Sequence, residues 1–305
     1  MKKFRLLICA IVLSVLILGI GGYLLIDLVT PKVGLCLAGA DRDMEEMLEV
    51  ALKRAGYTVL IQNGENDPES QNRQVENLRQ KGVKLLIVQP VDPADTAAVL
   101  EKAAETPVLF IGAEPENLGE SYFAGWNTQT LGRMQAELLE RYFTKADVNG
   151  DRYVDYMILS ASDNSVYFRA VEEAADAYET VKLEKTVCDG TADGAKEICK
   201  QAFSKYGRDL ELIFCDSSAL ALGAMEAVRE NGRTPGRDVI IIGAGIEKAS
   251  QEAIRTGAVT AALVEDAEAL CQQIVQTVKN LLSGKETEQK NYVDYKVITH
   301  ENVNA

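Results

Sequence analysis

The hydrophobic pattern begins with one long apolar segment. Residues 6–26 form an uncharged, mostly apolar stretch of 21 residues, and Lys2, Lys3 and Arg5 precede it. A helix of that length spans roughly 30 Å, the thickness of the hydrocarbon core of a bilayer, and the flanking positive charges favour the cytoplasmic side. We therefore expect residues 1–31 to be a cytoplasmic tip and transmembrane helix of a bacterial cell membrane protein, with the rest outside. Secretion after signal-peptide cleavage is the alternative, although no small-x-small cleavage site stands out.

Beyond residue 31, short apolar runs alternate with amphipathic segments. Strands are expected at 32–37, 57–62, 83–88, 108–111, 153–159, 181–187, 210–214, 239–243 and 260–263, with helical patterns between them and a final extended segment at 291–299. One continuous helix is expected at 128–143 and another at 265–282. Such alternation predicts right-handed crossovers and parallel sheets covered on both faces. The fold class is therefore α/β, with two similar Rossmann-like, doubly wound lobes.

Polar residues follow the carboxyl ends of several predicted strands. In open parallel sheets the ligand crevice lies outside these ends. The candidates for ligand contact are Asp41, Glu114, Asp163, Asp216 and Glu265. Asp216 and Glu265 can equally cap the helices that follow them. Trp126, the only tryptophan, lies where the chain first crosses between the lobes, and it serves either as a packing residue or as a stacking surface for a ligand.

An acidic turn at 147–155 has the spacing of a calcium loop. Side-chain oxygens stand at positions 1, 3, 5 and 9, and a backbone carbonyl is available at position 7, from Asp147, Asn149, Asp151, Asp155 and Tyr153. Position 6, which is Gly in an EF-hand loop, is Arg152, and position 12 is the apolar Ile158. A solvated acidic turn therefore stands beside the metal-site hypothesis.

The composition of the chain argues against several classes of function. The formal net charge of −14 repels phosphate backbones, and the sequence contains no basic stripe or helix-turn-helix pattern, so a nucleic acid partner is not expected. His300 is the only histidine, which leaves little material for a histidine base or a Ser-His-Asp triad. The six cysteines include no CxxC pair and are expected to be buried apolar residues. We predict that the chain is not an enzyme.

Several longer phrases carry a family resemblance. They are LLIVQPVDPADTAAVLEKA at 85–103, PVLFIGAEP at 107–115, LIFCDSSALALGAMEAV at 212–228, VIIIGAGIEKASQEAIRTGAVTAAL at 239–263 and VKNLLSGK at 278–285. From Lys32 to about Thr299 the chain resembles the type 1 periplasmic sugar-binding proteins, and most closely their glucose/galactose-binding branch. The resemblance implies a multi-strand hinge between two discontinuous lobes, 32–124 plus 264–289 and 125–263 plus 290–305.

The resemblance also implies particular site residues. It implies Ca²⁺ in the 147–155 loop, with Glu184 as the distant last ligand. In the sugar pocket, Met44 stands near the family's first aromatic position and Arg169 stands where the sugar-binding arginine would be. Other pocket positions depart from the family, because Gly112 and Gly245 replace an Asn and an Asp. These departures imply that the fold is retained and that hexose specificity is lost.

The function expected from this resemblance is that of a membrane-tethered extracytoplasmic solute-binding protein. It would close over a small polar ligand, a sugar or a sugar-like molecule, and serve an ABC permease or a membrane sensor protein. The alternative is an accessory or protein-interaction domain of a membrane sensor system whose cleft has decayed. The missing sugar-binding residues make this the main alternative to solute binding.

Overall fold

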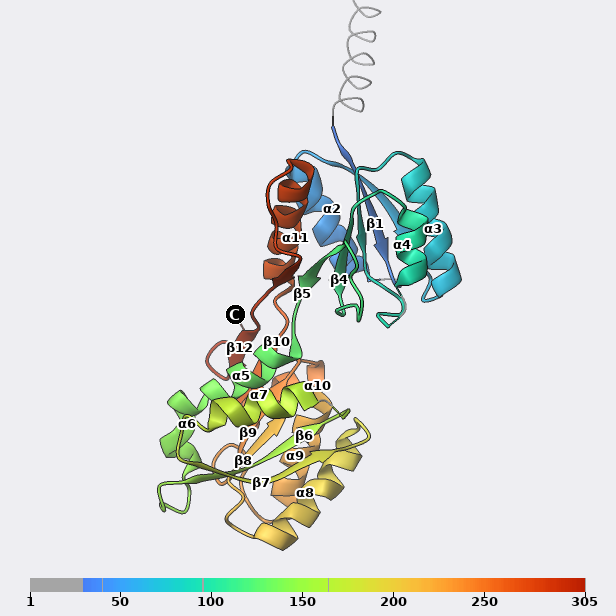
Figure 1. Ribbon diagram of the computed structural model, residues 1–305. Coiled ribbons are helices and arrows are strands. Elements are labelled where there is room, and N and C mark those ends of the chain that lie inside the picture. Colours follow the sequence, from blue (N-terminus) through green and yellow to red (C-terminus); the bar gives the residue numbers. More distant parts are fainter. Residues whose placement is uncertain (1–29, 40, 95, 164, 305) are drawn as a thin grey trace, which may run out of the picture. The chain divides into compact units, whose positions relative to one another are not determined.

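The computed structural model describes residues 30–39, 41–94, 96–163 and 165–304 (Figure 1). The chain divides into two compact units. The first lobe comprises the residues up to Gly125 together with Ala267–Val293, and the second comprises Trp126–Asp266 and Asp294–Ala305. The predicted membrane span at 6–26 lies outside the described residues. Among the helices that are described, none has the length and apolar character needed to cross a membrane.

The first lobe is built on a six-stranded sheet of order β11-β5-β4-β3-β1-β2, and all of its strand pairs are parallel. Its elements are β1 (Lys32–Leu37), α2 (Arg42–Arg54), β2 (Thr58–Asn63), α3 (Pro68–Gln80), β3 (Leu85–Val88), α4 (Ala97–Ala103), β4 (Val108–Gly112), β5 (Tyr122–Gly125), α11 (Ala267–Leu282) and β11 (Lys290–Tyr292). The local sequence determines where helix α3 begins. Asp67 caps the helix by accepting a hydrogen bond from the Ser70 amide (2.6 Å), and Pro68 is its first residue.

The second lobe repeats this architecture with the order β12-β10-β9-β8-β6-β7, in which only the β10–β12 pair is antiparallel. Its elements are α5 (Thr128–Glu137), α6 (Leu139–Ala146), β6 (Val154–Ser160), α7 (Ser165–Ala175), β7 (Thr180–Val187), α8 (Ala192–Tyr206), β8 (Leu212–Cys215), α9 (Ser218–Glu230), β9 (Ile240–Ala244), α10 (Lys248–Arg255), β10 (Ala261–Val264) and β12 (Lys296–Thr299).

Each face of the second sheet carries its own core. Met157 and Leu159 of β6 pack into one buried cluster with residues of α8 and α9, whereas Tyr156 and Ile158 pack into another with residues of α5 and α7. Successive side chains of a strand point to opposite faces, so a fully apolar strand requires cover on both sides. The doubly wound α/β prediction is therefore confirmed for both lobes.

Three sequence expectations need correction. The predicted helix at 128–143 is two helices, α5 and α6, which meet at Leu138. Strand β5 was not predicted, because its four residues, YFAG, are too short to give a periodic signal. The final segment is also divided: residues 290–292, for which the resemblance implies the second lobe, form β11 beside β5 in the first lobe. The lobe that residues 290–292 join is decided by which open sheet edge they pair with. The local sequence does not encode that choice.

Candidate functional site

A cavity of about 500 Å³ lies at the carboxyl ends of the central strands of the second lobe. It is formed by the last residues of β9 and β10 and by residues that follow β8, β9 and β10, together with one residue of α5 and one just before β12. The lining residues are Leu131, Asp216, Ser217, Ser218, Ala244, Gly245, Ile246, Glu247, Leu263, Val264, Glu265 and Tyr295. This is the position at which open α/β sheets bind ligands. The structure thus brings the predicted residues Asp216 and Glu265 into one cavity.

Asp216 is fixed by the neighbouring strand. Its carboxylate accepts hydrogen bonds from the Ser160 hydroxyl and from the Ala161 amide (3.1 Å), both at the end of β6. Burial raises the pKa of the Asp216 carboxyl, and the hydrogen bonds from Ser160 and Ala161 oppose that shift. The helix cap that was the alternative role for Asp216 belongs instead to Ser217, whose side chain accepts from the Leu220 amide. Asp216 is therefore a positioned acceptor at the cavity wall.

Glu265 and Tyr295 also line this cavity. Glu265 is exposed at the end of β10, and the surrounding protein still raises the pKa of its carboxyl by desolvation. Burial raises the pKa of the Tyr295 phenol, and the nearby charge of Glu265 raises it further. Tyr295 was not a sequence candidate, because it lies far along the chain and reaches this cavity only through the return of the chain before β12.

Gln135 holds the strand ends beneath this cavity. It lies on α5 and is fully buried, and its amide nitrogen donates to the carbonyls of Cys215 and Gly243, at 2.8 Å each. Its amide oxygen accepts from the hydroxyl of Tyr167 (2.6 Å). Every polar group in this cluster is thereby paired, as buried groups require. No sequence signal identifies Gln135, since nothing local shows that a helical glutamine faces two strand ends.

The predicted residues of the first lobe have local partners. Asp41 caps α2 by accepting from the Met44 amide (3.1 Å), and Met44 is half-buried in the first turn of that helix. Glu114 pairs with Lys290 (2.6 Å) and accepts from the Tyr292 hydroxyl (2.9 Å), which ties β11 to the loop after β4. These three residues lie near the carboxyl ends of β1 and β4, and each serves the structure of its own lobe.

The remaining ligand candidates do not line the 500 Å³ cavity of the second lobe. Asp163 is exposed after β6, and Arg169 is an exposed residue of α7 that lies 3.9 Å from Glu173. Trp126 is half-buried, and its Nε1 atom is buried without a hydrogen-bond partner among the described residues. An unused buried donor costs stability unless another molecule satisfies it. Trp126 thus remains the candidate with unmet hydrogen-bonding capacity.

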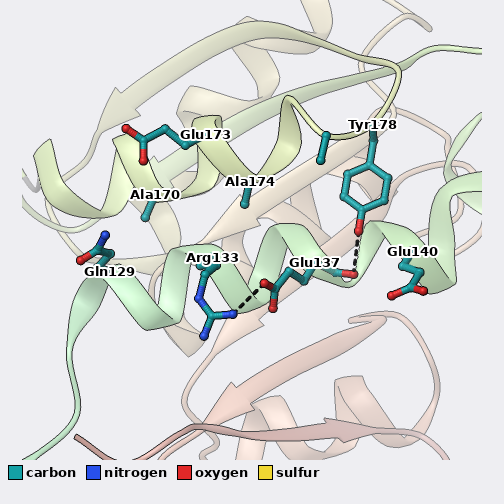
Figure 2. Close-up of a pocket in the computed structure, with 9 residues that line it drawn as sticks. Gln129, Arg133, Glu137, Glu140, Ala170, Glu173, Ala174 and Tyr178 are labelled. Atoms are coloured by element: carbon teal, nitrogen blue, oxygen red, sulfur yellow. Dashed lines mark hydrogen bonds and ion pairs between the residues drawn. The ribbon is translucent and has the colours of Figure 1, made fainter.

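A second cavity in the same lobe has a different character. This groove of about 560 Å³ lies between α5 and α7. Arg133 pairs with Glu137 (2.6 Å), and Tyr178 donates to the Glu137 carbonyl (3.5 Å) (Figure 2). Glu140 and Glu173 also line it. Because helix flanks form this groove and no strand end reaches it, it does not match the crevice expected of the fold.

The acidic loop folds as a compact turn. The Asp147 carboxylate accepts from the Gly150 and Arg152 amides, and Asp151 accepts from the Tyr153 amide (2.8 Å). Arg152 has a φ of 76°, the left-handed conformation that the sequence implied where a calcium loop has Gly. The loop backbone therefore follows the path of a calcium-loop turn. The carboxylates of Asp147 and Asp151 accept hydrogen bonds from its backbone N–H groups.

Glu211, and not Glu184, reaches this loop. The Glu211 side chain is fully buried and accepts from the amides of Val148 (2.8 Å), Asn149 (2.9 Å) and Asp155 (3.3 Å). Glu184 instead pairs with Lys205 (3.5 Å) at the end of α8. The prediction of Glu184 rests on its place along the chain, whereas Glu211 directly precedes β8, which pairs with β6.

The acidic loop carries side-chain oxygens of the kind that calcium ions bind. Ca²⁺ takes six to eight oxygen ligands. Within the described part of the chain, no group of three or more His, Cys, Asp or Glu side chains is placed to hold a metal ion. Burial raises the pKa of the Asp155 carboxyl, and the negative charges of Asp151 and Asp209 raise it further. The loop thus concentrates negative charge, and in this structure the carboxylates of Asp147 and Asp151 accept hydrogen bonds from amide groups of the loop itself.

A two-lobed α/β fold with a polar crevice at the carboxyl ends of its strands defines the class of solute-binding proteins. The family assignment agrees: residues 40–286 match the model described as periplasmic binding protein domain, and the chain belongs to this family. The predicted resemblance to type 1 periplasmic sugar-binding proteins is confirmed, because relatives and structural neighbours of this kind match the chain. The prediction that it is not an enzyme is confirmed, because these relatives are solute-binding proteins.

Individual relatives give the degree of similarity. The chain is 26% identical over 248 residues to the D-galactose/methyl-galactoside binding periplasmic protein MglB of Haemophilus influenzae, covering 75% of this chain and 73% of that protein. It is 24% identical to the ribose import binding protein RbsB of the same organism, covering 80% and 82%. A periplasmic ribose ABC transporter structure from Conexibacter woesei superimposes with a TM-score of 0.75 at 18% identity, covering 90% of this chain and 93% of that one.

Proposed function

We propose that this chain is a membrane-tethered, extracytoplasmic binding protein for a small polyhydroxylated solute, which it presents to an ABC permease or a membrane sensor protein. The observation that carries the proposal is the second-lobe cavity, where Asp216 and Glu265 place two carboxylates at strand ends beside Tyr295. Carboxylates accept hydrogen bonds from hydroxyl groups, and an aromatic ring suits the apolar face of a sugar or cyclitol. Relatives named for galactose, ribose and rhizopine support this ligand class.

The tether is part of the proposal. The apolar run at 6–26 and the three positive charges before it support a single membrane span. Only five residues separate Ile26 from Lys32, the first residue of β1, so the first lobe would lie close to the membrane.

Calcium binding by the 147–155 loop also stays a prediction, supported by the resemblance and the spacing. It would require Asp147 and Asp151 to exchange N–H partners for the ion, with Glu211 in the place first given to Glu184.

The second candidate function is a protein-interaction domain with a decayed cleft. Its support is that Glu114 and Arg169, two predicted ligand residues, are engaged with Lys290 and Glu173 of the chain itself. Such a domain would retain the fold and bind no solute in it. The two functions differ in a measurable property, which is stabilisation by a small molecule.

The test is thermal melting of the protein against a panel of pentoses, hexoses and inositols. A ligand present at one hundred times its dissociation constant stabilises the folded state by about 2.7 kcal/mol. We expect at least one member of the panel to raise the melting temperature, and the Glu265→Gln variant to reduce that shift. Glu173→Gln in the groove of Figure 2 is the matched control and should leave it unchanged. If no member of the panel stabilises the protein, the solute-binding proposal fails and the decayed-cleft function is supported.

A further inference from the structure

The first lobe gathers unpaired cations at the edge where its strands begin. Lys32 is the first residue of β1, Lys84 precedes β3, Arg54 ends α2 and Lys81 follows α3. Among the described residues, none of these four cations takes part in an ion pair, although Lys53 nearby pairs with Glu49 (2.5 Å). Together with Arg79 of α3 they form what is called here the basic edge. This concentration is notable in a chain whose formal net charge is −14.

The fold places Lys32 and Lys84 side by side. The Lys84 amide donates to the Lys32 carbonyl (2.7 Å), and Lys32 is paired with Thr58, the first residue of β2. Helices commonly carry cations in their last turn, where the charge complements the helix dipole. That explanation can cover Arg54, Arg79 and Lys81, which lie at the ends of α2 and α3. It does not cover Lys32 and Lys84, because they lie at the starts of strands.

The basic edge also contains a cavity. It measures about 540 Å³ and is lined by Arg79, Val83, Lys84, Ala104, Glu105, Thr106 and Pro107. The Arg79 Nε atom is buried and has no hydrogen-bond partner among the described residues. Glu76 lies 3.8 Å from Arg79, and Glu105 is on the cavity lining, so these two carboxylates offset part of the positive charge. An unused guanidinium N–H, an ammonium group and a threonine hydroxyl are donors that suit a phosphate group.

The chain enters the fold at this same edge. The Thr30 hydroxyl lies 2.8 Å from that of Thr58, and the Thr58 amide donates to the Pro31 carbonyl (3.0 Å), so residues 30–31 are held beside Lys32. From Ile26 to Lys32 the chain can extend by at most about 20 Å, at ~3.5 Å per residue. With the proposed anchor in place, the basic edge would therefore lie next to the lipid headgroups.

We propose that the basic edge is a docking surface for anionic phospholipid headgroups, whose phosphates are taken up at the cavity between Arg79, Lys84 and Thr106. This inference rests on the proposed membrane anchor for its location, but the surface itself consists of described residues. An anionic bilayer repels a protein of net charge −14 unless a cationic face is turned toward it. The basic edge supplies that face and fixes which end of the first lobe meets the membrane.

The experiment uses the full chain in nanodiscs of phosphatidylcholine alone or of phosphatidylcholine and phosphatidylglycerol mixed two to one. Lysine acetylation is then followed by mass spectrometry at each site. We expect Lys32, Lys81 and Lys84 to react several-fold more slowly in the anionic discs, and high salt to abolish the difference. Lys145 and Lys248, exposed lysines of the second lobe without an ion pair among the described residues, are the internal controls and should react equally in both discs.

Lysine-to-glutamine variants test whether the basic edge itself makes the contact with the anionic lipid. Lys81→Gln with Lys84→Gln removes two exposed cations and should restore most of the reactivity of Lys32, while Lys145→Gln with Lys248→Gln should not. Binding of the same variants to phosphatidylglycerol vesicles should weaken on the order of tenfold for the basic-edge pair only. Millimolar inorganic phosphate in phosphatidylcholine discs is a further arm. If phosphate alone protects Lys84 as well as the anionic discs do, the cavity is a free-anion site and the membrane-docking proposal is overturned.

The anchor and the docking surface can fail separately. Equal lysine reactivity in both discs, with the chain retained by both, overturns the docking surface and leaves the anchor standing. Retention only by anionic discs, lost in the Lys81→Gln and Lys84→Gln variant, supports the docking surface and overturns the anchor. Retention by neither disc overturns both.

Discussion

Single buried carboxylates organise the second lobe. Glu211 shows this best, since its fully buried side chain accepts three backbone amides from the 147–155 loop while burial raises the pKa of its carboxyl. The loop would otherwise leave these amides without acceptors next to the sheet. A buried acceptor with several donors contributes more to stability than an exposed ion pair does.

We expect Glu211→Gln to lower the free energy of unfolding by about 1–3 kcal/mol, because an amide replaces one carboxylate oxygen and leaves a loop N–H unpaired. Glu184→Gln is the matched control and should cost less than about 1 kcal/mol, since it removes only the pairing with Lys205. Urea denaturation of both variants measures the difference.

The same variants test calcium when they are melted with calcium and with EGTA. Stabilisation of the wild type and of Glu184→Gln, with none in Glu211→Gln, would assign Glu211 as the distant ligand. Stabilisation lost only in Glu184→Gln would contradict that assignment, and no effect of calcium on any of the three would contradict calcium binding itself.

Between elements, polar side chains fix the strand ends that form the candidate site. Gln135 joins α5 to the ends of β8 and β9 and to Tyr167 of α7. All three contacts are buried, so the positions of these four elements depend on one amide group. Ser160 and Asp216 add the corresponding link between β6 and β8.

Replacing Gln135 by Leu should destabilise the protein by about 2–4 kcal/mol, because two carbonyls and one hydroxyl lose their partners in a place that water does not reach. Gln129→Leu, at an exposed position of the same helix, should change the stability by less than about 0.5 kcal/mol. Chemical denaturation of the two variants provides the comparison. Equal effects would mean that the Gln135 amide contributes nothing beyond helix packing.

At the scale of the whole molecule, charge is distributed unevenly. The second lobe holds several carboxyls whose pKa is raised chiefly by burial, namely Asp155, Glu211, Asp216 and Glu265. Hydrogen bonds to arginine lower the pKa of others, such as Glu252 with Arg255 and Glu301 with Arg141. The first group binds protons more tightly in the folded than in the unfolded chain, and the second group less tightly.

The melting temperature should therefore rise as the pH falls from 7 to about 5. A group with a raised folded pKa contributes stability below that pKa and loses it as the pH rises through it, whereas the lowered groups lose stability only below about pH 4. Melting followed by circular dichroism across this range measures the effect, and Glu211→Gln should reduce the rise. A melting temperature that falls steadily from pH 7 to 5 would contradict this expectation.

The alternation of apolar and amphipathic segments determined most of the strands and helices and both doubly wound lobes, because period and turn chemistry are local properties. It also placed Asp216 and Glu265 correctly at strand ends. It could not find Tyr295, Gln135 or Glu211, since each acts on residues distant in sequence that sheet pairing brings close. The basic edge follows the same rule: its five cations are scattered from 32 to 84, and only the parallel register of β1, β2 and β3 collects them. Local sequence determined the elements, and only the tertiary structure decided which charges and donors face one another.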